Sequence, residues 1–265
     1  MRNVVFATTV ALLSAGTAHA QTAAEPTIVF TVYAGAVTGH GLWAIDRQPL
    51  CQFAGNGLCT GVYDTVSIAR DVGSSLSVGL AMTYFPHSTL GVQFDVSFLG
   101  LPLEDRCVPI GVPSGSNQAL CQSIPANSPG GSALSFELGV IARPPAGSSP
   151  LRPYARLGVG LLTHSESTVE VDGSYGSNQG TKIIITDDTP YHTSASLFGG
   201  VGLVANLSPG YLLRLEARDV YAKLARVNGP ANDLGVAPTN TRSFHHIALS
   251  LGLGIVLEQK RGRRY

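Results

Sequence analysis

Six charged side chains lie within segments that are otherwise apolar or small. Each stands at a polar position of a segment in which apolar residues alternate with small or polar ones. Such positions share one face of a strand, and an isolated ion away from water is very costly. Because three of the six are acidic and three are basic, they can neutralise one another as ion pairs. They are Asp95, Glu137, Arg156, Arg214, Glu216 and Arg218.

Histidine and serine residues near the C-terminus offer a nucleophile and a base, the chemistry of a hydrolase. On a strand, however, His246 and Ser250 would be about 13 Å apart, far beyond a hydrogen bond. No nucleophile motif accompanies them or the adjacent His245. His192 follows two aspartates at 187–188, but this segment has the composition of a solvated loop. We therefore predict no enzyme, no metal site and no cofactor.

A strict alternation organises residues 75–99. In 75–84 and 90–98 every second residue is large and apolar, and the residues between are small or polar. A period of two predicts strands, and runs of roughly 10 residues match tilted strands that cross a bilayer. The Pro-His-Ser sequence at 86–88 predicts the turn between them. We interpret the segment as a transmembrane hairpin with its apolar face toward lipid and its small face toward a lumen.

The same alternation recurs along the chain, and the connections between the strands are long and short in turn. Outer-membrane barrels have long extracellular loops and short periplasmic turns, and an even number of strands places both termini in the periplasm. An open sheet edge cannot exist in hydrocarbon, so the sheet must close. The predicted fold is all-β, a closed antiparallel transmembrane β-barrel of about eight strands. The further strands are expected at 28–37, 132–143, 152–162, 192–206, 211–221 and 247–257.

The N-terminus has the form of a secretory signal. Arg2 provides the positive charge, 4–13 is a short apolar core, and Ala18-His19-Ala20 is a small-x-small cleavage site. The alternative, a membrane anchor, would need a longer apolar core. We expect a signal peptide over 1–20, a barrel over 21–258 and a basic periplasmic tail over 259–265.

The bulk composition excludes several classes of protein. Charged residues make up 13% of the 265 residues and the formal net charge is zero, which argues against nucleic-acid binding. Hydrophobic residues make up 44%, which argues against disorder. No stretch reaches the roughly 20 consecutive apolar residues of a transmembrane helix.

Four cysteines fall as two close pairs in the long loops. An exported chain can keep disulfides, and local pairing within each loop is the predicted arrangement, although spacing alone does not separate the three connectivities. The predicted bonds join Cys51 to Cys59 and Cys107 to Cys121.

Aromatic residues near strand ends suit the girdles that flank the apolar band of a membrane barrel. Ordinary strand composition is the alternative explanation. The predicted girdle residues are Tyr84, Phe85, Phe98 and Tyr211.

Three segments, RPYARLGVGLL, GGVGLVANLSPGYLLRLEARDVY and HHIALSLGLGIVLEQ, resemble the second half of small OmpA/OmpX-type outer-membrane barrels. The resemblance implies a monomer in the bacterial outer membrane, inserted by the barrel assembly machinery and in contact with outer-membrane lipid and lipopolysaccharide. One departure concerns assembly: such barrels often end on an aromatic residue, whereas here the last strand runs through Ile255 and Leu257, and Tyr265 follows a basic segment.

Three function classes follow. The first is a structural or surface-interaction protein whose disulfide-tied outer loops bind a surface ligand. The second is a narrow gated pore for small solutes, because resembling barrels carry a charged lumen pair whose switching is linked to conductance. In the first class the six lumen charges are a plug that fixes strand register, and in the second they are a gate. The third class, an enzyme that modifies outer-membrane lipid, fits the residues least.

Overall fold

The computed structural model describes most of the predicted mature chain. It covers residues 26–39, 41–53, 59–111, 115–128, 130–145, 149–165, 171–174, 181–185, 193–222 and 244–258. The signal peptide, the basic tail at 259–265 and the aspartate-histidine segment at 187–192 lie outside these residues.

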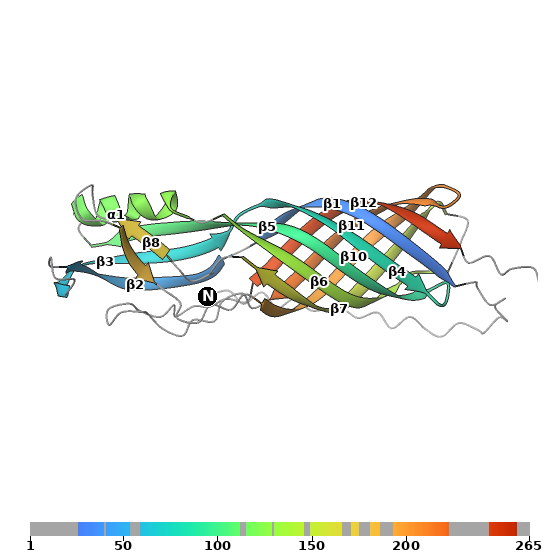
Figure 1. Ribbon diagram of the computed structural model, residues 1–265, viewed down its shortest axis with the longest axis horizontal. Coiled ribbons are helices and arrows are strands. Elements are labelled where there is room, and N and C mark those ends of the chain that lie inside the picture. The colour runs from blue at the N-terminus through green and yellow to red at the C-terminus, as the bar shows by residue number, and fades with distance from the viewer. Residues whose placement is uncertain are drawn as a thin grey trace, which may run out of the picture.

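Eight strands form a closed ring (Figure 1). Each strand is antiparallel to both neighbours, and the pairings of β1 with β12 and of β5 with β6 complete the circle. The predicted closed antiparallel barrel of about eight strands is therefore confirmed. The ring consists of β1 (Thr27–Gly39), β4 (Ser75–Phe85), β5 (Leu90–Ile110), β6 (Gly130–Ala142), β7 (Leu151–His164), β10 (Thr193–Ser208), β11 (Tyr211–Ala222) and β12 (Phe244–Glu258).

The two faces of the ring differ as a membrane barrel requires. On β4, Leu76 and Leu80 are exposed on the outer face, whereas Ser77 and Thr83 are buried in the lumen. The other seven strands repeat this pattern, so a continuous apolar surface surrounds the barrel. Bulky apolar residues on the outside of a closed sheet are stable only against lipid. Among the described residues no helix is long and apolar enough to cross a membrane.

The two ends of the barrel are also different. The connections between β4 and β5, β6 and β7, and β10 and β11 are short and lie at the end where β1 begins and β12 ends. In outer-membrane barrels the short turns and the termini are periplasmic. We therefore call this end periplasmic and the opposite end outer.

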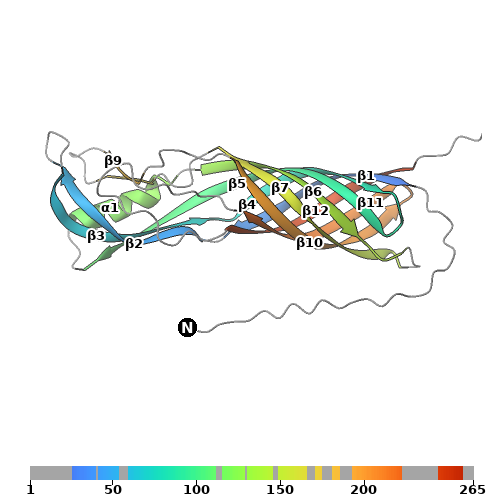
Figure 2. The ribbon, with the colours of Figure 1, turned by 90° about the horizontal axis from the view of Figure 1, so that it is seen from below.

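The outer end carries an ordered extension that differs from the predicted loops. Residues 38–73 contain β2 (Gly41–Phe53) and β3 (Cys59–Val72), and residues 100–131 contain the end of β5 and α1 (Gly115–Ala126). These elements project beyond the barrel together with the short strands β8 (Val171–Ser174) and β9 (Thr181–Ile185) (Figure 2). The hairpin joins the barrel sheet because β3 pairs with the outer part of β5, from Thr65 with Ile110 to Val72 with Leu103.

A single apolar core fills the extension and continues into the outer mouth of the barrel. Its barrel members are Val37, Leu99, Ala133, Leu162, Ala222 and Ala248. Its extension members include Leu42, Trp43, Ile45, Val66, Ile68, Leu101, Leu103, Leu120 and Ile124. The extension is thus packed onto the barrel through buried side chains as well as through β5.

Lumen glycines make room for aromatic rings on neighbouring strands. A Cβ atom at Gly202 would lie 2.4 Å from the ring of Tyr154, and one at Gly79 would lie 2.4 Å from the ring of Tyr33. A close approach of this kind needs a residue with no side chain. The two rings occupy the space that side chains at these glycines would need, and so help to fill the lumen.

We expect Gly202→Ala to destabilise the barrel by about 1–3 kcal/mol, because the added methyl group displaces the Tyr154 ring in a filled lumen. The measurement is urea unfolding of the protein in lipid vesicles, followed by the electrophoretic shift of the folded form. Gly199→Ala on the same strand is the control, because a Cβ atom there meets nothing within 4 Å. Equal midpoints for the two variants would contradict the packing argument.

Candidate functional site

The six predicted charged residues lie together in the middle of the lumen. All six side chains are buried, with Asp95 and Glu137 each only 1% exposed. They come from four strands: β5 carries Asp95, β6 carries Glu137, β7 carries Arg156, and β11 carries the other three. Alternation turns all of them inward, and closure of the barrel brings the strands within reach of one another.

Arg156 lies at the centre of this network. Its guanidinium is 2.7 Å from the carboxylate of Glu216. It is also 3.4 Å from Asp95 and 3.6 Å from Glu137. One cation on β7 therefore contacts all three carboxylates of the group.

The other two arginines complete the pairing. Arg218 lies 2.8 Å from Glu137 and 3.7 Å from Asp95. Arg214 pairs with Glu216, two residues away on the same face of β11. The three positive and three negative charges balance, so the network is neutral as a whole. Neutrality with close pairing is the arrangement that a buried set of ions requires.

Uncharged side chains donate further hydrogen bonds to two of the three carboxylates. The Tyr33 hydroxyl donates to Asp95, and the Tyr154 hydroxyl donates to Glu216 at 2.7 Å. The Gln93 amide also donates to Asp95, at 3.2 Å. These partners were not among the predicted site residues, although their inward positions in alternating segments could have identified them.

Apolar layers lie on both sides of the charged layer. On the outer side is the core shared with the extension. On the periplasmic side is a second buried cluster, and a cavity of about 30 Å³ lies beside it, with room for about one or two water molecules. The charged layer thus lies between two apolar clusters, and the small cavity on its periplasmic side reaches Arg214. The periplasmic cluster consists of Val29, Phe85, Ile141, Tyr154 and Leu212.

The histidines and serine considered for catalysis do not form a compact site. His246 is buried in the lumen, and Ser250 faces the same way two strand repeats further along β12. His245 faces outward, where its Nδ1 lies 3.1 Å from Asp219 and its ring meets Tyr221 edge to face. Among the described residues no group of three or more His, Cys, Asp or Glu is placed to hold a metal ion.

Three of the four predicted girdle residues lie on the outside of the barrel. Tyr84, Phe98 and Tyr211 are between 43% and 52% exposed. Phe85 was wrongly assigned to the girdle: it is 4% exposed and packs in the periplasmic cluster. The reason is parity, because Phe85 directly follows the outward Tyr84 and must point into the lumen.

In the part of the extension that the structure describes, a disulfide and a buried ion pair add to the apolar core. Cys107 on β5 and Cys121 on α1 form the predicted local disulfide, whereas the side chains of Cys51 and Cys59 lie outside the described residues. Arg70 on β3 pairs with Asp105 on β5 through two contacts of 2.6 and 2.7 Å. This pair was missed because both residues fell in segments predicted to be loops.

We expect Arg156→Met to destabilise the barrel by about 3–5 kcal/mol, because it leaves three buried carboxylates without their shared cation while preserving volume. Arg106→Met is the matched control. Arg106 is 69% exposed at its side chain and pairs with Asp71, so its loss should cost less than about 1 kcal/mol. The check is the unfolding midpoint in lipid vesicles, and similar midpoints for both variants would show that the network is not stabilising.

Comparison with known proteins supports the fold. No protein-family model and no curated protein matches the chain. Among solved structures, the outer membrane protein OprG from Pseudomonas aeruginosa is similar over 89% of this chain and 97% of its own, with 16% identity and a TM-score of 0.50. AlkL in lipid bilayers is similar over 95% and 99%, with 14% identity and a TM-score of 0.43. Neisserial surface protein A is similar over 86% and 96%, with 14% identity and a TM-score of 0.40.

The similarity to OprG is a similarity of fold. It agrees with the eight-stranded ring and with the apolar surface around it. The chain has the fold of a small bacterial outer-membrane β-barrel protein, and its lipid-facing surface suits that membrane.

Proposed function

We propose that the protein is a sealed outer-membrane anchor that presents a folded extension at the cell surface, where it has a structural or surface-interaction role. The observation that carries this proposal is the filling of the lumen by a neutral ion-pair layer between two apolar layers. A barrel of about eight strands is just wide enough for side chains to fill it. A filled lumen leaves no path for solutes, so the barrel serves to hold the chain in the membrane. The extension is then the part that can make contacts at the cell surface.

The extension has the construction of a stable surface element. β5 is 21 residues long and continues from the bilayer-spanning ring into the pairing with β3. The Cys107–Cys121 bond ties α1 to that strand, and Arg70 with Asp105 ties β3 to it. An ordered scaffold of this kind holds contact residues in place and lowers the entropy lost on binding.

The exposed face of α1 suggests the kind of contact made. The helix contains no charged residue, and its exposed polar side chains include the amides of Gln118 and Gln122. Amides donate and accept hydrogen bonds without a net charge. We therefore expect contacts made by α1 itself to depend little on ionic strength. His246 and Ser250 face the lumen, away from lipid ester bonds, and no catalytic role is proposed for them.

The first test is current through planar bilayers that contain the refolded protein. We expect no discrete conductance steps, because each of the three lumen layers would have to open together. Arg214→Ala should also be silent, since it leaves both apolar layers intact. Insertion is verified by protease protection. Steady steps whose size or open probability changes in Arg214→Ala would instead establish the gated pore and overturn the sealed anchor.

The second test is retention of cells that display the protein on polystyrene and on an extracellular-matrix gel. A deletion of residues 41–72 removes the β2–β3 hairpin, and the new ends can join because Val37 already pairs with Ser75. We expect retention to fall several-fold in this variant. Gly199→Ala, which leaves the extension intact, is the control for expression. Equal retention of the deletion variant would contradict a surface role for the hairpin.

A further inference from the structure

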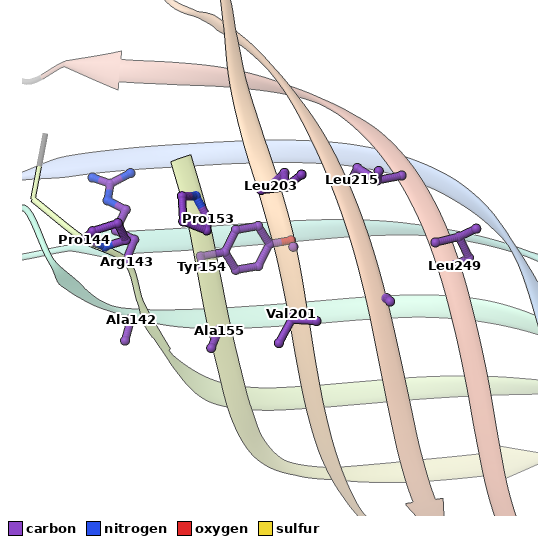
Figure 3. A pocket seen from close by; sticks show the side chains of 12 residues that line it. Ala142, Arg143, Pro144, Pro153, Tyr154, Ala155, Val201, Leu203, Leu215 and Leu249 are labelled. Carbon is purple, nitrogen blue, oxygen red and sulfur yellow. The ribbon is translucent and has the colours of Figure 1, made fainter. Parts of the chain in front are cut away.

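Two arginines stand at the periplasmic mouth of the barrel, where β6 ends and β7 begins. Arg152 has the inward parity of β7, and Arg143 directly follows β6 with the inward parity of that strand. The Arg143 guanidinium lies 3.6 Å from the centre of the buried Phe85 ring, which confirms its lumen side. Residues of the opposite parity, such as Ala142 and Ala155, face lipid and line the apolar groove shown in Figure 3. Both arginines therefore belong to the interior of the barrel mouth.

These two arginines share a small cavity with a third. The cavity of about 30 Å³ at this mouth is lined by Arg143, Arg152 and Arg214. Arg152 and Arg214 lie at the same level of the wall, because both pair with Val204 on the strand between them. Thr31 lines the same cavity from β1. Three cations thus surround a space with room for about one or two water molecules.

Only one of the three cations has a carboxylate partner. Arg214 pairs with Glu216 within the charged layer. The Arg143 Nε donates to the carbonyl oxygen of Ser88 at 2.9 Å, which is an uncharged partner. The Arg152 Nε is buried with no hydrogen-bond partner in the part of the chain that the structure describes. Among the described residues neither Arg143 nor Arg152 forms an ion pair, so the mouth carries two positive charges that the protein does not balance there.

The two unbalanced charges also act on one another. Burial, together with the neighbouring positive charge of Arg152, lowers the pKa of Arg143 to about 10. Both side chains therefore stay charged at neutral pH, at a cost in repulsion. The terminal nitrogens of both guanidinium groups are donors. An anion between them removes the repulsion and accepts charge-assisted hydrogen bonds from both.

We propose that the mouth cavity binds one small inorganic anion, of the size of chloride, between Arg143 and Arg152. Size supports this occupant, because about 30 Å³ accommodates an ion little larger than a water molecule and excludes anions of several heavy atoms. The hydroxyl group of Thr31 offers the anion a further donor. The bound anion balances charge at the periplasmic end of the lumen, as the carboxylates do in the charged layer. This inference goes beyond the proposed surface function and does not depend on it.

The test is urea unfolding of the protein in lipid vesicles at increasing chloride, with gluconate, which is too large for the cavity, replacing chloride at constant ionic strength. Above the dissociation constant, each tenfold rise in chloride should lower the unfolding constant about tenfold, because one anion is released on unfolding. Arg152→Gln should lose most of this dependence. Arg106→Gln, at an exposed arginine on the extension, should keep it. No chloride dependence in the unmodified chain, or the same dependence in Arg152→Gln, overturns the proposal.

A comparison in gluconate alone separates anion binding from a merely structural role of Arg152. Without the small anion, Arg152→Gln removes a charge that repels Arg143, so the variant should be at least as stable as the unmodified chain. A variant that is less stable by the same amount in gluconate and in chloride would make Arg152 a structural residue and contradict the proposal. Folding of each variant is checked by its electrophoretic shift.

Crystals of the unmodified protein soaked in bromide give a measurement that needs no variant. We expect one anomalous peak between the guanidinium groups of Arg143 and Arg152. The absence of a peak there also overturns the proposal.

Discussion

Closure of the backbone hydrogen-bond ladder is the constraint on which the rest of this structure depends. In hydrocarbon every peptide group must be paired within the protein, and a sheet achieves this only as a ring. The ring fixes which side chains point inward, because alternation leaves no choice once the outer face meets lipid. It also fixes the width of the lumen, and with it the total side-chain volume that the lumen can hold. Charged side chains enclosed in so narrow a lumen must pair with one another, as they do in the charged layer.

The filled lumen explains why glycine and large polar side chains occur together on the same faces. Gly202 faces the same interior as Arg156, and the Tyr154 ring occupies the space that a side chain at Gly202 would need. The Tyr154 hydroxyl then meets Glu216, which pairs with Arg156. The small residues on one strand therefore make room for the long side chains of the next strand. Changing any of them alters both the volume and the charge balance of the interior.

Sequence patterns predicted the barrel well because its strands lie between two uniform environments. Lipid outside and a lumen inside impose a period of two that needs no tertiary information to recognise. The same pattern located the six lumen charges by position, although which carboxylate meets Arg156 depends on strand register. Phe85 was misplaced because its nearness to a strand end was given more weight than its parity. Its neighbour Tyr84 had already fixed the outward face.

The β2–β3 hairpin and α1 were not predicted, because these segments lack that uniform environment. The core of the extension lies between the hairpin and α1, and repeated register shifts between β2 and β3 interrupt the alternation. α1 has few of the usual signals of a helix, since it carries no charges at its ends and contains Pro125. Trp43 and Arg70 meet only in the folded chain, so their roles depend on contacts between distant segments.

The length of β5 has a mechanical consequence. The strand runs without a hinge from the bilayer into the extension, and a ladder of hydrogen bonds joins it to β3 along its outer part. A force applied to the outer hairpin would act along these strands, loading many hydrogen bonds in shear at once. The load would pass to β4 and β6 and spread around the ring. A pull on the extension would therefore be resisted by all the strands of the barrel together, and not by a single flexible connection.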